Sequence, residues 1–172
     1  DDQHREIDHT VQVENELVDE ALGRVQDVLA ERGQYEHTDV FFTSDHGDLG
    51  GHAGLIFKGP YHVDALLRVP LVWRPAASAA IAPAVIDEPV GMVDLARTFC
   101  AIAGINAPAE MQGEPLPTAP GSRRERVITT YDSQFARVGM HLRTIYRDGM
   151  ICTAYEPSTR DRGGRFPIMS AL

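Results

Sequence analysis

A carboxylate and an imidazole are adjacent in the run Asp45-His46-Gly47, directly after a short apolar segment. Carboxylate oxygens and imidazole nitrogens are both metal ligands, so the pair can serve one divalent cation if the backbone turns sharply there. Gly47 favours such a turn because it has no Cβ atom. The alternative is that Asp45 caps the following turn and that His46 is an ordinary loop residue.

Lys58 is the only lysine of the chain and lies within Phe57-Lys58-Gly59-Pro60. An ammonium group carried by a glycine-bearing loop can neutralise charge that develops on a sulfuryl or phosphoryl oxygen. We therefore consider Lys58 a candidate catalytic and substrate-binding residue. A solvated surface lysine is the alternative.

Two histidines flank Lys58 in the sequence and can exchange protons near neutral pH, since an unperturbed histidine titrates at about pH 6.5. We consider His52 a candidate catalytic residue and His62 a candidate substrate-binding residue. Either imidazole could instead satisfy carbonyl groups of the loop. Asp48 is expected to cap backbone amides rather than to bind metal.

The segments that precede this cluster are typical of an α/β fold. Apolar residues recur at steps of three and four between Val11 and Leu29, which predicts a long amphipathic helix that stops at Gly33. Residues 38–43 are β-branched and aromatic, which predicts a buried strand that ends just before Asp45. In open α/β sheets ligands bind outside the carboxyl ends of strands, so the polar cluster lies where a site is expected.

The segments that follow are shorter. Five glycines within residues 47–59 predict an ordered loop without regular structure. Residues 69–73 are predicted as a strand, with Pro70 near its start or at a sheet edge. A short helix is predicted over residues 93–103.

The last part of the chain contains late strands that we expect to be antiparallel. Residues 126–131 are predicted as one strand, and residues 142–155 as a β-hairpin that turns at Asp148-Gly149. Residues 158–172 show no periodicity and are predicted to be unstructured.

Composition limits the partners and the compartment. The 25 acidic and 16 basic residues give a net charge of −9, which disfavours binding to nucleic acid or to anionic membranes. No apolar run reaches the roughly 20 residues of a membrane helix, and the N-terminus is too polar for a signal peptide.

Cys100 and Cys152 form neither a disulfide framework nor a paired zinc motif, and we expect both to be buried apolar side chains. The chain starts without Met, so its true N-terminus is expected elsewhere and its localisation is not predicted.

Several spaced blocks together resemble the second metal-binding motif of the sulfatase family. The blocks are Thr43-Ser44-Asp45-His46-Gly47-Asp48, Gly54-Leu55, Lys58-Gly59-Pro60 and Leu67-Arg68-Val69-Pro70-Leu71. The resemblance extends from about Val11 to Tyr155 and includes the start of the predicted short helix. It implies an α/β fold in which a partial alkaline-phosphatase-like sheet with flanking helices is followed by a small antiparallel β region.

The resemblance also implies a domain organisation. Residues 1–121 would form the C-terminal portion of a sulfatase catalytic domain, residues 122–157 its C-terminal antiparallel strands, and residues 158–172 an unstructured tail.

The chemistry implied by the resemblance is metal-dependent cleavage of a small-molecule sulfate ester. Asp45 and His46 match the paired metal ligands of the family, and Lys58 matches the lysine that contacts the sulfate and the leaving-group oxygen. The implied cofactor is a divalent cation, commonly calcium, that holds the sulfate beside a formylglycine nucleophile. Imidazole suits manganese or zinc better than calcium, so the identity of the metal stays open.

Two departures from the family pattern affect these expectations. Relatives often have His directly before the glycine that corresponds to Gly54, whereas this chain has Ala53 there and His52 one position earlier. The family nucleophile lies in a Cys-or-Ser, x, Pro, x, Arg motif, and neither Cys100 nor Cys152 is followed by that pattern. We therefore expect a fragment that is inactive alone, with the formylglycine in a missing N-terminal part. A phosphonate or phosphate ester hydrolase of the same superfamily and a catalytically inert remnant are the alternatives.

Overall fold

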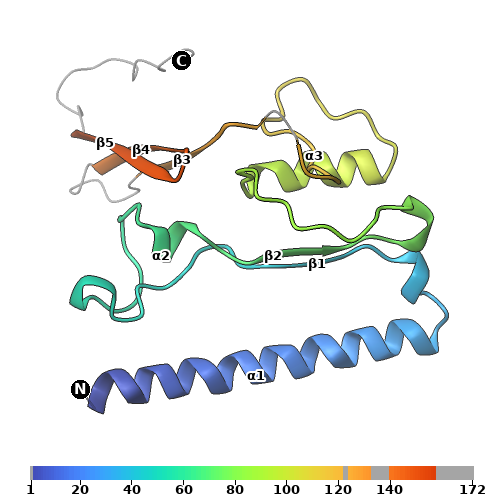
Figure 1. The fold of residues 1–172 in the computed structure, drawn as a ribbon, viewed down its shortest axis with the longest axis horizontal. Helices are drawn as coiled ribbons and strands as arrows, with labels where there is room; N and C mark the ends of the chain where they lie inside the picture. The colour runs from blue at the N-terminus through green and yellow to red at the C-terminus, as the bar shows by residue number, and fades with distance from the viewer. Residues whose placement is uncertain (1, 122–123, 133–139, 158–172) are drawn as a thin grey trace. The chain divides into compact units, whose positions relative to one another are not determined.

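The computed structural model describes residues 2–121, 124–132 and 140–157 (Figure 1). The predicted tail over residues 158–172 lies outside them. The chain folds as two compact units, the first from residues 1–87 and 116–122 and the second from residues 88–115 and 123–172. The division into a catalytic portion, late strands and a tail stays a prediction.

The first unit begins with the long helix α1, Asp2–Glu31, drawn in blue in Figure 1. Gly33 follows it with a positive φ of 65°, and the Gly33 amide donates a hydrogen bond to the Ala30 carbonyl at 2.9 Å. This left-handed cap ends the helix as the sequence predicts. The apolar face of α1 stays largely exposed, with Val18 49% and Val25 57% exposed.

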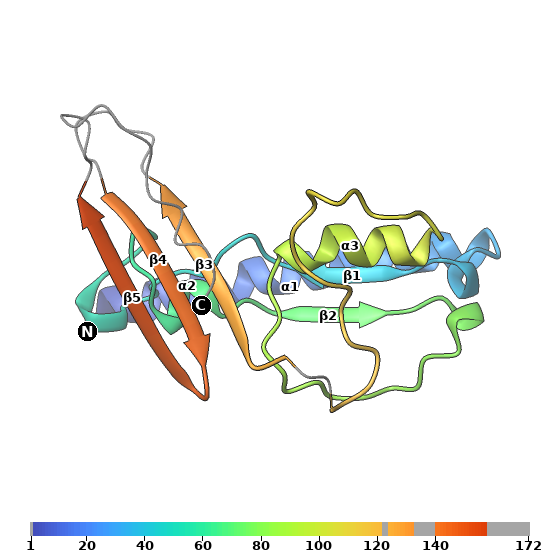
Figure 2. The same cartoon turned by 90° about the horizontal axis from the view of Figure 1, so that it is seen from above.

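Strands β1, Val40–Thr43, and β2, Leu71–Arg74, form an antiparallel pair that Figures 1 and 2 both show side by side. The rings of Phe41 and Trp73 face each other across the pair, with centroids 5.1 Å apart. Strand β1 is half-buried rather than buried as predicted, because β2 is its only strand partner among the described residues. Strand β2 starts directly after Pro70, as expected.

A short 3₁₀ helix, Tyr35–His37, joins α1 to this strand pair. The Arg74 guanidinium lies 3.5 Å from the centre of the Tyr35 ring and donates hydrogen bonds to the carbonyl groups of Tyr35 and Thr38. The Asp39 carboxylate accepts a hydrogen bond from the Trp73 indole at 2.8 Å. These contacts fix the start of β1, and therefore also the position of the polar residues that follow Thr43.

The second unit contains α3, Val93–Ile102, and the strands β3, Arg126–Asp132, β4, Met140–Arg147, and β5, Met150–Pro157. The strands pair in the order β3-β4-β5 and are antiparallel throughout (Figure 2). Asp148 and Gly149 both have positive φ, as a tight hairpin turn requires. The predicted helix, strand and hairpin are thus confirmed.

The two cysteines are less buried than predicted. Cys100 is only half-buried, and Cys152 is exposed. Cys152 pairs with Ile145, which pairs in turn with Ile128, and Ile128 is 58% exposed. Side chains alternate between the faces of a sheet, so Cys152 belongs to the more open face of β3-β4-β5.

None of the helices in the described residues is both long and apolar enough to cross a membrane.

Candidate functional site

The loop between β1 and β2, residues 44–70, carries every predicted site residue. Strand β1 ends at Thr43, and the Ser44 hydroxyl then donates a hydrogen bond to the His46 carbonyl at 2.7 Å. The His46 amide donates one to the Asp45 carboxylate at 3.0 Å. This tight turn leaves the Asp45 side chain 85% exposed beside the His46 ring.

Gly47 is required by a close backbone approach rather than by the turn conformation that the sequence suggested. Its φ is not positive. A Cβ atom at Gly47 would lie 2.0 Å from the carbonyl oxygen of Ala65, which belongs to the short helix α2, Asp64–Leu67. The Gly47 amide donates a hydrogen bond to the Leu66 carbonyl at 2.9 Å, and Leu66 is buried. Only glycine fits between β1 and α2 here.

Lys58 meets His46 at the end of β1. The Lys58 Nζ lies 2.7 Å from the His46 Nε2, and the His46 Nδ1 lies 2.8 Å from the Gly47 carbonyl oxygen. An ammonium group can only donate, so Nε2 accepts and Nδ1 carries the ring proton that is donated to Gly47. The Asp45 Oδ2 is 3.6 Å from the same Nε2, and because the ring is neutral in this arrangement, the contact is not an ion pair.

The segment before Lys58 is folded back on itself by backbone hydrogen bonds. The Leu49 amide donates to the Phe57 carbonyl at 2.8 Å, and the Gly51 amide donates to the Leu55 carbonyl at 2.8 Å. The Asp48 carboxylate accepts a hydrogen bond from the Gly50 amide at 2.8 Å, which confirms its expected capping role. This fold brings Lys58 back to His46, twelve residues earlier in the chain.

His52 and His62 lie in different environments. His52 starts the 3₁₀ helix His52–Gly54, where it is exposed and its amide donates to the Leu49 carbonyl. His62 is only 9% exposed, and burial lowers the pKa of its imidazole below the ordinary value of 6.5. His62 is therefore neutral at physiological pH.

The donor set at this loop fits part of a metal site. Asp45 and His46 offer a hard oxygen and an imidazole nitrogen to the same space. Within the described residues, no group of three or more His, Cys, Asp or Glu side chains converges as metal ligands would. Asp45 and His46 are thus two candidate ligands, and they do not make a complete metal site by themselves.

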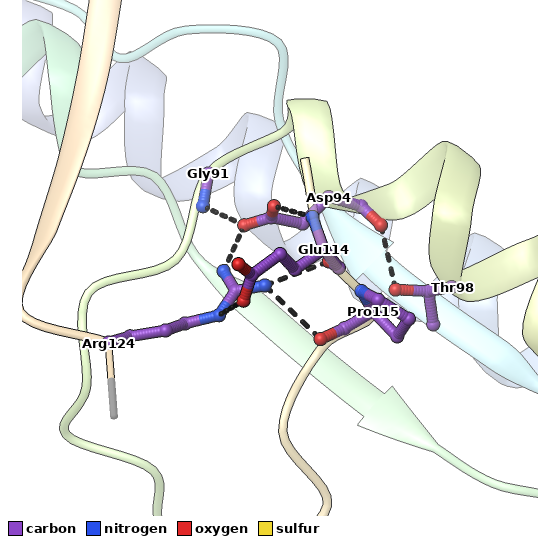
Figure 3. Close-up of polar contacts among 6 residues, drawn as sticks. All are labelled: Gly91, Asp94, Thr98, Glu114, Pro115 and Arg124. Atoms are coloured by element: carbon purple, nitrogen blue, oxygen red, sulfur yellow. Dashed lines mark hydrogen bonds and ion pairs between the residues drawn. The ribbon is translucent and has the colours of Figure 1, made fainter. Parts of the chain in front are cut away.

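A second carboxylate cluster, which the sequence did not predict, surrounds Asp94 at the start of α3 (Figure 3). The Asp94 carboxylate accepts hydrogen bonds from the Gly91 amide at 2.8 Å, from the Glu114 amide at 2.9 Å and from the Arg124 guanidinium. Burial alone would raise the pKa of Asp94, but these hydrogen bonds, led by that of Arg124, hold the pKa below its ordinary value.

The Arg124 guanidinium, like the Asp94 carboxylate, makes several hydrogen bonds. It also donates to the carbonyl groups of Glu114 and Pro115, at 2.8 and 3.2 Å, and its side chain is 13% exposed (Figure 3). Asp94 was visible in the sequence only as a residue near a helix start. Arg124 lies thirty positions later, in a segment without periodicity, so no sequence signal paired the two.

A third polar group lies across β3 and β4. Asp132 stands opposite His141 in the register and accepts hydrogen bonds from His141 Nδ1 and from Arg143, both at 2.8 Å. The hydrogen bond from His141, and then that from Arg143, lower the pKa of Asp132. Strand register brings these residues together, and the sequence alone does not give that register.

Comparisons with known proteins define the class of the molecule. The family model described as Sulfatase matches residues 5–105, more than half of the chain, and the chain therefore belongs to the sulfatase family. The protein named uncharacterized sulfatase YidJ, from Escherichia coli strain K12, is 38% identical over 102 residues, which cover 59% of this chain and 20% of that protein. The family expected from the motif is thus confirmed.

Solved structures confirm the expected alkaline-phosphatase-like α/β fold. The phosphonate monoester hydrolase of Agrobacterium radiobacter matches with a TM-score of 0.65 and 21% identity, over 84% of this chain and 33% of that one. A 2-O GAG sulfatase matches with a TM-score of 0.63 and 23% identity, over 81% of this chain and 32% of that one. The chain spans a fifth to a third of the length of these proteins.

Proposed function

We propose that the protein containing this chain hydrolyses a small-molecule sulfate ester and that the loop between β1 and β2 forms part of its active site. The observation that carries the proposal is the convergence of one ammonium group, one imidazole and one carboxylate. The Lys58 Nζ lies 2.7 Å from the His46 Nε2, and the Asp45 Oδ2 lies 3.6 Å from that nitrogen. Membership of the sulfatase family supports a sulfate ester as the substrate.

The residues divide into a metal-binding pair and a substrate-binding set. Asp45 and His46 would hold a divalent cation, with calcium as the leading candidate and manganese as the alternative, and such a cation withdraws charge from the ester oxygens. Lys58 donates hydrogen bonds to the sulfate and the leaving-group oxygen, where negative charge develops. His62, which is buried and neutral, donates a hydrogen bond to the substrate. His52, which is exposed, exchanges a proton with the substrate.

The nucleophile in this proposal is a formylglycine outside the chain. Neither Cys100 nor Cys152 is followed by the x, Pro, x, Arg pattern that the modification requires in the family. Residues 1–121 then act as the C-terminal portion of the catalytic domain, and residues 122–157 as strands that follow it. We expect no turnover by the 172-residue chain alone.

The full-length protein should cleave 4-nitrophenyl sulfate in a way that depends on this loop. Loss of one group that stabilises transition-state charge costs about a hundredfold or more in kcat, so Asp45→Ala and Lys58→Ala should each fall by at least that factor. Asp48→Asn is the matched control, because Asp48 only caps the Gly50 amide and asparagine can keep that bond. Undiminished rates in both alanine variants would refute the assigned roles.

A phosphonate or phosphate ester is the second candidate substrate, because a cationic site of this kind serves any tetrahedral anion. One of the solved structures that share the fold is named a phosphonate monoester hydrolase. The ratio of kcat/KM for 4-nitrophenyl sulfate to that for 4-nitrophenyl phenylphosphonate separates the two. Absence of turnover with both esters would support the third reading, a catalytically inert remnant.

A further inference from the structure

We propose that Lys58 and the divalent cation compete for the same lone pair on His46, so that binding of the cation transfers the Lys58 ammonium from His46 to the substrate anion. The inference rests on the proposed function and assigns Lys58 a second role within it. Lys58 is then a residue that weakens cation binding when no substrate is present, in addition to being a ligand of the anion.

The competition follows from the chemistry of the ring. A neutral imidazole has a single lone pair in its plane, and in His46 that lone pair is on Nε2 because Nδ1 donates its proton to the Gly47 carbonyl. The Lys58 ammonium group donates a hydrogen bond to this lone pair, and the 2.7 Å between Nζ and Nε2 is a short distance typical of a charged donor. A metal ion coordinated by this imidazole would need the same lone pair. Both partners cannot occupy it.

The imidazole is held ready for either partner. The Gly47 carbonyl fixes the tautomer, as backbone carbonyls do for metal-binding histidines. Gly47 is held in turn by its hydrogen bond to Leu66 and by its close approach to Ala65. Exchange of one partner for the other therefore requires no rotation of the His46 ring.

Lys58 has the freedom that the exchange needs. The residue is exposed, and its ammonium group ends a flexible four-carbon side chain. The backbone before it is anchored by the hydrogen bond between the Leu49 amide and the Phe57 carbonyl. Release from His46 therefore moves the ammonium group and leaves the loop in place.

The exchange would couple the two ligands of the site. A bound cation frees Lys58 for the substrate anion, and a bound anion holds Lys58 away from His46. By thermodynamic reciprocity each ligand then increases the affinity for the other. Substrate and cation bind together more tightly than either does alone.

The first test measures Ca²⁺ and Mn²⁺ affinity of the full-length protein by titration calorimetry without substrate. Lys58→Met removes the competing donor and should tighten the cation Kd about tenfold, because a charged hydrogen bond must no longer be broken. Lys58→Arg keeps a charged donor and should stay close to the wild type. Arg68→Met removes a positive charge that pairs with Asp64 at 3.8 Å, and it should change the Kd less than about twofold.

The second test observes the ammonium group directly. With ¹⁵N-lysine labelling, the signal that disappears in Lys58→Arg belongs to Lys58, and saturating Ca²⁺ should shift it. Three results would overturn the competition. The cation affinity of Lys58→Met could be unchanged or weaker, or Arg68→Met could gain as much affinity as Lys58→Met does. The third such result is a Lys58 signal that does not shift when Ca²⁺ is added.

His46→Ala separates this inference from the proposed function. If His46→Ala binds the cation as well as the wild type does, or if neither binds it, the metal site itself is wrong and the competition falls with it. If His46→Ala loses the cation while Lys58→Met shows the wild-type Kd, the metal site stands and only the competition is refuted.

Discussion

Asp45 and Asp94 are carboxylates with opposite surroundings. The Asp45 side chain is 85% exposed, and it accepts a hydrogen bond from the amide of the adjacent His46. The Asp94 side chain is 5% exposed and bound by two amides and the Arg124 guanidinium. A buried carboxylate with its oxygens occupied holds the fold together, whereas an exposed one beside an imidazole can bind a ligand. We therefore assign Asp94 to the stability of the fold and keep Asp45 as the proposed ligand.

The largest effect is expected for Asp94→Ala. The substitution removes the carboxylate partner of the nearly buried Arg124 guanidinium, and breaking a buried pair from one side costs about 3–5 kcal/mol. Urea unfolding monitored by circular dichroism measures the loss. The double variant Asp94→Ala with Arg124→Met should recover part of it, because no uncompensated charge is then left. A loss of less than about 1 kcal/mol in the single variant would contradict a structural role for Asp94.

The pH dependence of stability provides a second measure of the Asp94 cluster. The folded pKa of Asp94 lies below its ordinary value of 3.8, so the unfolded chain takes up the proton first as pH falls. The contribution of Asp94 is therefore complete above pH 3.8 and is lost as pH drops from there through the folded pKa. The free energy of unfolding of Asp94→Asn should fall less steeply than that of the wild type over this range. Parallel pH profiles would argue against the cluster.

An intermediate effect is expected for Gly47→Ala, which tests how the exposed site is supported. The new Cβ would lie 2.0 Å from the Ala65 carbonyl oxygen, so α2 must move away at a cost of about 2 kcal/mol. The same movement disturbs the carbonyl that fixes the His46 ring, so Ca²⁺ affinity should fall as well. Gly23→Ala is the matched control, because nothing lies within 4 Å of its Cβ, and alanine in a helix should stabilise α1. Similar stability changes in the two variants would refute the close approach.

Local sequence patterns predict most of the helices and strands and the loop that carries the candidate site. The apolar steps of α1, its Gly33 cap, the strand before Asp45 and the Asp148-Gly149 turn all depend on residues that are close in sequence. His46 and Lys58 lie twelve positions apart within a spaced motif, and that motif made the loop recognisable.

The other contacts depend on long-range geometry that single-sequence patterns do not encode. The pairing of Asp94 with Arg124 spans thirty positions, and the exposure of Cys152 follows from the strand register. The requirement for glycine at position 47 follows from the position of Ala65. In each case the sequence shows the residue type, and the distant partner that determines its role is visible only in the structure.

The smallest effect on stability is expected for Asp45→Ala, and this result would complete the comparison with Asp94. Because the side chain is 85% exposed and accepts its hydrogen bond from the adjacent His46 amide, the free energy of unfolding should change by no more than about 0.5 kcal/mol. The same variant should lose Ca²⁺ binding in titration calorimetry, since half of the proposed ligand pair is removed. A loss of stability as large as that of Asp94→Ala would instead show that Asp45 is held in the fold, and a carboxylate held there could not also be available to a cation.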